Sequence, residues 1–164
     1  MKRLLMPNDA FLKHVVGLIE EGHEVTLLAR GNSMRPFIED GRDTLAFRKV
    51  DKLSVGDVIL AEPKDGLFVC HRIEKIDNGI ITMRGDGNVV GTEMFAEDRV
   101  RAKLVTINRL GKTYNMATSR TWKIYSAIWP RLLPARKYLL SLYRLLWLHQ
   151  RPFKWRKARL SNNS

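Results

Sequence analysis

The sequence has a single cysteine, Cys70, among its 164 residues. One cysteine excludes an internal disulfide framework and a zinc site built from cysteines. The four histidines stand alone in the sequence, and no two of them have the spacing of metal ligands. We therefore expect no bound metal and no other cofactor.

Long hydrophobic runs are also missing. The apolar run of residues 4–6 ends at Pro7, and this is far too short for the core of a secretory signal. The most apolar stretch, residues 138–150, is interrupted by Arg144 and is shorter than the ~18 residues of a transmembrane helix. We therefore expect a cytoplasmic protein, peripheral to the membrane, with neither a signal peptide nor a transmembrane helix.

Acidic residues are absent from the carboxyl-terminal third of the chain. Residues 1–108 hold 16 Lys/Arg and 17 Asp/Glu, whereas residues 109–164 hold 13 Lys/Arg and no acid, so the net charge of +12 belongs to the tail. Tryptophan and tyrosine lie among these cations, a mixture that favours an anionic membrane surface. We expect residues 120–159 to bind such a surface. The alternatives are packing against the rest of the chain or a partner protein, and nucleic acid, which is unlikely because the tail is a poor reader of bases.

Over the rest of the chain, short segments rich in β-branched or apolar residues alternate with turn residues, and this pattern predicts strands. Helical spacing of apolar residues predicts a helix over residues 8–21. Strands are predicted over residues 25–29, 44–47, 57–61, 67–76, 79–84 and 99–107. In the tail we expect a linker over 114–121, a helix over 122–129 and a second helix from Pro134 to about Gln150. The predicted architecture is mainly β: residues 1–23 form an amino-terminal helix, 24–112 a compact antiparallel β domain and 113–164 a basic, aromatic-rich helical tail.

The most informative segment is residues 29–38, Ala-Arg-Gly-Asn-Ser-Met-Arg-Pro-Phe-Ile, which follows a predicted strand. Gly31 permits a tight backbone approach and Pro36 fixes the exit from the turn. Ser33, held at such a strand end, can present its hydroxyl to a carbonyl carbon while its own N–H stabilises the oxyanion. The other interpretation of Ser33 is an ordinary turn serine.

Two later segments supply groups that could activate this serine. The strand around His71 carries an imidazole, the usual base for a serine nucleophile at neutral pH. The segment Arg84-Gly-Asp-Gly-Asn88 places Asp86 in a turn after another strand, and an acid commonly orients the base. The alternatives are a core histidine and a tight turn closed by an Asx hydrogen bond.

Four motifs in order resemble the signal peptidase I superfamily, which includes the LexA-type self-cleaving repressors. They are residues 31–36 (Gly-Asn-Ser-Met-Arg-Pro), 55–59 (Val-Gly-Asp-Val-Ile), 71–73 (His-Arg-Ile) and 84–88. The resemblance covers roughly residues 24–108. Bacterial signal peptidases and LexA-type proteins use a lysine as the base, so a histidine at this position resembles the endoplasmic-reticulum and archaeal type.

The resemblance implies a role for each residue at the motif positions. Ser33 takes the position of the nucleophile and His71 that of the base. Asp86 is the expected orienting acid, and Glu93 is the alternative. The resemblance also implies three residues that bind substrate. Met34 would line the substrate groove, and Gly31 and Asn32 would lie at the oxyanion hole. Some bacterial relatives have a serine at the position of Gly31. For Met34 a core position is the alternative, and Cys70 is expected to be a buried structural thiol.

The sequence thus predicts a serine endopeptidase that cleaves a leader or signal-like segment from a peptide or protein precursor. A second hypothesis is a non-catalytic peptide-binding module docked on a membrane by its basic tail. A third, a LexA-type regulator bound to nucleic acid, is disfavoured because a histidine replaces the lysine and no DNA-binding helical domain precedes the β domain.

Overall fold

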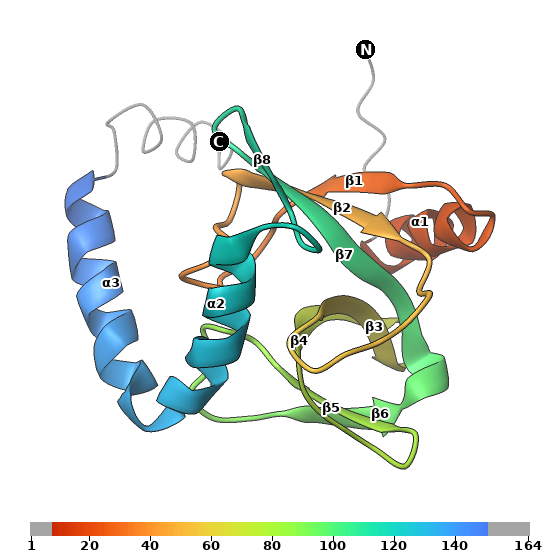
Figure 1. Cartoon of the computed structure of the whole chain (residues 1–164). Coiled ribbons are helices and arrows are strands. Elements are labelled where there is room, and N and C mark those ends of the chain that lie inside the picture. The colour runs from red at the N-terminus through yellow and green to blue at the C-terminus, as the bar shows by residue number, and fades with distance from the viewer. Residues whose placement is uncertain (1–7, 151–164) are drawn as a thin grey trace.

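The computed structural model of the protein describes residues 8–150, with side chains described for residues 10–146. The body is an eight-stranded antiparallel sheet in the order β1-β2-β7-β3-β4-β5-β6, with β8 paired to β7 (Figure 1). Its elements are α1 Asn8–Glu20, β1 Val25–Leu28, β2 Asp43–Arg48, β3 Val58–Lys64, β4 Leu67–Asp77, β5 Ile80–Arg84, β6 Glu93–Ala96, the 3-10 turn η1 Glu97–Arg99, β7 Val100–Arg109 and β8 Lys112–Asn115.

The sheet confirms the predicted fold class. Each of the six predicted strands is present with both ends within three residues of the expected position, and the predicted helix is α1. The sequence did not indicate β6 and β8. Both strands have only four residues, and so short a segment shows little periodicity.

Two apolar clusters hold the body together. The first lies between α1 and the strands β1, β2 and β7, and it includes Ile19, Phe47 and Leu104. The second lies on β3, β4, β5 and β6, around Ile73 and Met83. The alternating burial along β5, whose side chains at 81 and 83 are buried, shows why one face of this strand is apolar.

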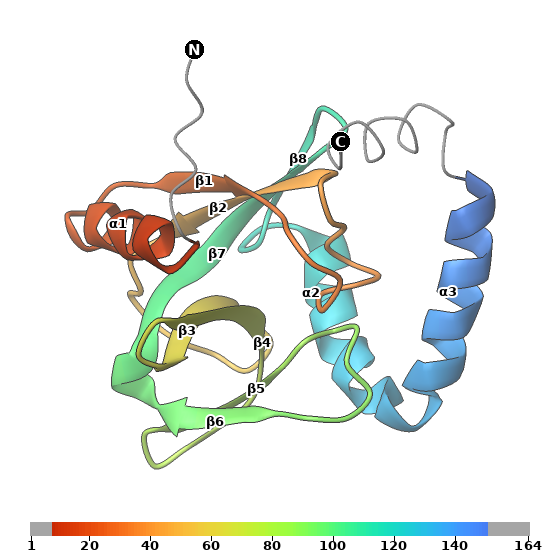
Figure 2. The ribbon, with the colours of Figure 1, turned by 180° about the vertical axis from the view of Figure 1, so that it is seen from behind.

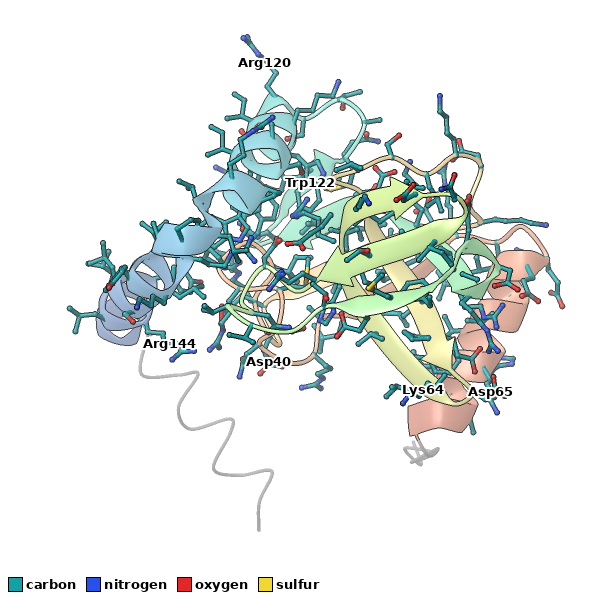
Figure 3. The ribbon with its side chains drawn as sticks, turned by 90° about the horizontal axis from the view of Figure 1, so that it is seen from below. Asp40, Lys64, Asp65, Arg120, Trp122 and Arg144 are labelled. Atoms are coloured by element: carbon teal, nitrogen blue, oxygen red, sulfur yellow. The ribbon has the colours of Figure 1, made fainter. Side chains whose placement is uncertain are left out.

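The basic tail folds as helices against this body. The helix α2 (Arg120–Ile128) leads through the 3-10 segment η2 (Trp129–Ala135) into α3 (Arg136–Gln150). Trp122 belongs to the first apolar cluster, and Figure 3 shows it reaching from α2 toward the sheet while Arg120 extends away from the body. Pro134 lies inside η2, so α3 begins two residues later than expected.

Two tryptophans of the tail, which we expected at a membrane surface, are buried. Trp122 and Trp129 are only 4% and 7% exposed, so these two rings pack inside the protein instead of facing a membrane. Trp147 belongs to α3 but its side chain, like the whole of residues 151–164, lies outside the described residues. Between residues 8 and 150, no helix combines the length and apolarity that a membrane span requires.

The three predicted units share elements. β8 crosses the expected boundary at residue 112, and Trp122 of the tail completes the core of the β domain. The partition at residues 23 and 112 stays a prediction, with the tail helices in direct contact with the body.

Candidate active site

Ser33 lies in the loop of residues 29–42 that joins β1 to β2. Backbone hydrogen bonds close the base of this loop: the Ala29 N–H donates to the Asp43 carbonyl, and the Gly41 N–H donates to that of Ala29, both at 2.8 Å. Asp43 is fully buried and accepts hydrogen bonds from Arg42 and Arg109. Burial opposes its charge, but these guanidinium groups keep the pKa of Asp43 below its ordinary value. The loop is therefore fixed at its base.

The turn of residues 85–88, between β5 and β6, packs directly on this loop (Figure 2). The Gly87 N–H donates to the Ser33 carbonyl at 2.7 Å. A Cβ atom on Gly85 would lie 2.4 Å from the Ser33 carbonyl oxygen and 3.0 Å from His71 Nε2. Only glycine fits there, and the Ser33 carbonyl oxygen and His71 Nε2 both lie on this side of Gly85.

His71 projects from the middle of β4 and is 4% exposed. Its Nδ1 lies 2.9 Å from Glu93 Oε2 on β6. The register explains the contact: Ile73 pairs with Met83 and Met83 pairs with Glu93, so residues 71, 73, 83 and 93 share one face of the sheet. A carboxylate on Nδ1 fixes the ring orientation and leaves Nε2 toward Gly85 and Ser33.

Asp86 does not contact His71, contrary to our expectation for the orienting acid. Its carboxylate forms a bidentate pair with Arg72, with N–O distances of 2.8 and 2.7 Å, and both side chains are buried. Arg72 follows His71 in β4 and therefore points to the opposite face. Burial opposes the charge of Arg72, yet the Asp86 carboxylate keeps the pKa of Arg72 raised. The acid that contacts His71 is Glu93, the alternative named from the sequence.

Ser33 itself is half-buried, and its backbone N–H donates to no acceptor in the described part of the chain. Gly31 adopts the positive φ of 89°, and its N–H donates to Asp40 Oδ1. Between residues 8 and 150, no hydrogen bond joins the Ser33 hydroxyl to the His71 ring. Such contacts in ligand-free sites are often long and shorten when substrate binds. The site thus holds a hydroxyl, an imidazole, a carboxylate and an available N–H.

The model of the family described as Peptidase S24-like matches residues 7–105. This match covers more than half of the 164-residue chain. The chain belongs to the Peptidase S24-like family. This assignment supports the superfamily that contains LexA and signal peptidases, which the four sequence motifs resembled. No curated protein and no solved structure matched the chain in the corresponding searches.

The S24-like family includes serine peptidase-like hydrolases as well as non-catalytic and autoproteolytic members. The residues Ser33, His71, Asp86 and Glu93 fall inside the matched region, whereas β8, α2, η2 and α3 lie beyond it. The helical tail is therefore an addition to the S24-like part of this chain.

That added tail supports the turn beside Ser33. The Trp129 indole N–H donates to the Asp86 carbonyl at 2.9 Å, and Arg136 donates to the Asn88 carbonyl at 3.0 Å. Ser126 Oγ accepts a hydrogen bond from Arg72 at 2.7 Å. Through these contacts the tail helices hold the turn that packs on the Ser33 loop.

Met34 and Cys70 pack with the first apolar cluster. Met34 is 6% exposed and belongs to the first apolar cluster, so it takes the core position and not the expected place in a substrate groove. Cys70 packs against the same cluster. Burial raises the pKa of the Cys70 thiol to about 12, which leaves it almost wholly protonated at neutral pH.

Sequence reasoning ranked the two acids in the wrong order for contact with His71. The decisive signal was β6, which places Glu93 across the sheet from β4 through β5. Because this four-residue strand was not predicted, Glu93 had no assigned neighbour. The supporting roles of Ser126, Trp129 and Arg136 had no signal in the sequence, because each acts on a residue at least 40 positions away.

Proposed function

We propose that this S24-like protein is a serine endopeptidase in which Ser33 is the nucleophile and His71 the general base, oriented by Glu93. The observation that supports this most directly is that the Ser33 carbonyl and His71 Nε2 lie on the same side of Gly85, with Glu93 on the other ring nitrogen. The loop that carries Ser33 thus adjoins the His71 ring and its carboxylate partner, an arrangement that suits a hydroxyl-activating site.

The proposed reaction begins when His71 Nε2 accepts the proton of the Ser33 hydroxyl. Oγ then attacks the substrate carbonyl carbon, and the negative oxygen of the tetrahedral intermediate accepts a hydrogen bond from the Ser33 N–H. His71 returns the proton to the leaving amine as the peptide bond breaks, which leaves an ester on Ser33. Water, deprotonated by His71, hydrolyses the ester and restores the serine.

Two open strand edges favour an extended peptide as substrate. β1 is an edge strand that leads into the Ser33 loop. In β4, residues 67–71 pair with β3, while pairing with β5 begins only at Arg72. Backbone groups on these edges can pair with a substrate strand and carry it past both reacting groups. A leader or signal-like segment of a precursor has the extended, flexible character that this binding mode requires.

The tail offers a surface that would place the enzyme on an anionic membrane. Tyr138, Leu142, Leu145 and Leu146 of α3 are each more than half exposed. Arg120, Lys123 and Lys137, from α2 and α3, are exposed cations of the same tail, in which residues 109–164 contain no acid. Apolar and basic side chains together match the interface and the headgroups of an anionic bilayer.

A fluorophosphonate probe tests the proposed chemistry, because it forms a covalent bond with an activated serine. We expect labelling of the wild-type protein and a loss of labelling in both Ser33→Ala and His71→Ala. The matched control is Ser141→Ala, which changes an exposed serine of α3 and should leave labelling intact. If the folded wild-type protein is not labelled, the non-catalytic peptide-binding module replaces the enzyme. Labelling that persists in Ser33→Ala would reject this nucleophile.

A further inference from the structure

A polar cavity of about 170 Å³ lies between the Ser33 loop and α3. Two of its lining residues are backbone neighbours of Ser33, because Asn32 precedes Ser33 and the Gly87 N–H donates to the Ser33 carbonyl. The six residues that line it are Asn32, Arg35, Gly87, Leu140, Tyr143 and Arg144. Half of these residues belong to α3, outside the region that matches the family.

The lining of this cavity carries positive charge, of which that on Arg35 is paired with the carboxylate of Glu39. It contains two guanidinium groups, an amide and a phenol but no carboxylate. Glu39 is close by but fully buried, where it accepts hydrogen bonds from Arg35 at 3.0 Å and from the Tyr143 hydroxyl at 3.1 Å. These contacts also tie α3 to the Ser33 loop.

Arg144 is the member of this lining that is most available to a ligand. It is exposed, and it makes no hydrogen bond or ion pair with any other described residue. Figure 3 shows its side chain extending from α3 on the side of the loop that carries Asp40. A guanidinium group recognises a carboxylate by two parallel hydrogen bonds.

We propose that this cavity is a substrate subsite that binds the carboxylate of an aspartate or glutamate side chain close to the scissile bond. The inference rests on the proposed function, because it assigns the chemistry of the substrate for the same site. Arg144 binds the carboxylate directly, and Asn32, which also lines the cavity, directly precedes Ser33. The tail thereby gives this S24-like chain a selectivity that the matched region alone does not contain.

Peptide pools of fixed composition test this subsite. Each pool is a ten-residue library in which one position is fixed as Glu, Gln or Lys and the others are random. We expect the wild-type protein to cleave Glu pools faster than Gln pools at one position, by about tenfold, which is the factor given by ~1.4 kcal/mol. Arg144→Gln should remove most of this ratio, and Arg144→Glu should shift the preference to Lys. The matched control is Lys137→Gln, which removes an exposed cation of the same helix that does not line the cavity.

Binding to the Ser33→Ala protein separates this proposal from the peptidase proposal. The same pools are equilibrated with Ser33→Ala and with Ser33→Ala combined with Arg144→Glu, and the retained peptides are identified by mass spectrometry. Retention of Glu pools that depends on Arg144 supports the subsite even if no pool is cleaved. The subsite proposal is overturned if peptides are cleaved or retained without a preference for Glu at any position. It is also overturned if a preference for Glu is found and Arg144→Glu leaves it unchanged.

Discussion

Gly85 lies against both the Ser33 backbone and the His71 ring. Its missing Cβ is the space that lets the Ser33 carbonyl and His71 Nε2 approach from the same side. The backbone at Gly85 does not need the positive φ that favours glycine, so the requirement is steric. A side chain here would displace the Ser33 backbone or the His71 ring, and a small displacement of either would misplace the proposed nucleophile relative to the proposed base.

We therefore predict that Gly85→Ala lowers the rate of fluorophosphonate labelling by at least about 100-fold, the effect of a displacement of about 1 Å in an active site. The crowding should also cost about 1–3 kcal/mol of unfolding free energy. Gly17→Ala is the matched control, because a Cβ at this α1 position meets no atom within 4 Å. That change should stabilise the helix by about 0.5–1 kcal/mol and leave the labelling rate unchanged. Equal rates in both variants would contradict this role of Gly85.

Asp86 pairs with Arg72, whereas Glu93 contacts His71. Replacing each acid by its neutral amide should therefore have a different effect on stability and on labelling. Asp86→Asn leaves the Arg72 charge buried without its partner, which should cost about 3–5 kcal/mol in urea unfolding. Glu93→Gln changes a partly exposed side chain and should leave stability nearly unchanged. It should reduce the labelling rate by about tenfold or more, because the His71 ring loses its orienting carboxylate. The reverse pattern, with Glu93→Gln unstable and fully active, would restore Asp86 as the orienting acid.

At the scale of elements, η2 acts as a support for the turn of residues 85–88. Its Trp129 is buried, and the indole N–H satisfies the carbonyl of Asp86. The first residue of α3, Arg136, donates to the carbonyl of Asn88, two residues further along the turn. A turn beside a nucleophile needs such contacts, since an unpaired buried carbonyl costs about 1–3 kcal/mol.

Trp129→Phe should retain the ring packing and remove only this hydrogen bond. We expect a loss of about 1–3 kcal/mol in unfolding free energy and a lower labelling rate for the folded protein. Trp122→Phe makes the same exchange at a ring whose N–H has no hydrogen bond among the described residues. Trp122→Phe should lower the unfolding free energy and leave the labelling rate of the folded protein unchanged. A Trp129→Phe protein with an unchanged rate would show that η2 supports folding alone.

At the scale of the whole molecule, α3 has one face toward the body and one face toward solvent. Arg136, Leu140 and Tyr143 form the inner face of α3, spaced at i, i+4 and i+7. Tyr138, Leu142 and Leu145 repeat the same spacing on the outer face, and all three are exposed. The body covers the inner face of α3 and leaves the apolar side chains of the outer face in contact with solvent.

We predict that the protein sediments with vesicles containing phosphatidylglycerol and much less with vesicles of phosphatidylcholine alone. Replacing Leu142 and Leu145 together by serine should abolish this binding, because each buried methylene contributes about 0.8 kcal/mol. Val90→Ser is the control, since Val90 is an exposed apolar residue outside the tail. Undiminished binding by the double variant, or equal binding to both lipids, would mean that α3 is not the docking surface.

The sequence alone determined the class of fold, the position of Ser33 and His71 in it and the separation of charge along the chain. These properties are local: alternation of apolar residues, turn signals and short motifs each span a few positions. The tertiary structure decided which acid meets His71, because that depends on a three-strand register through the short strand β6. It also decided that Trp122 and Trp129 pack inside the protein. An interfacial tryptophan and a core tryptophan have the same apolar ring, and only the neighbouring surface determines which of the two it becomes.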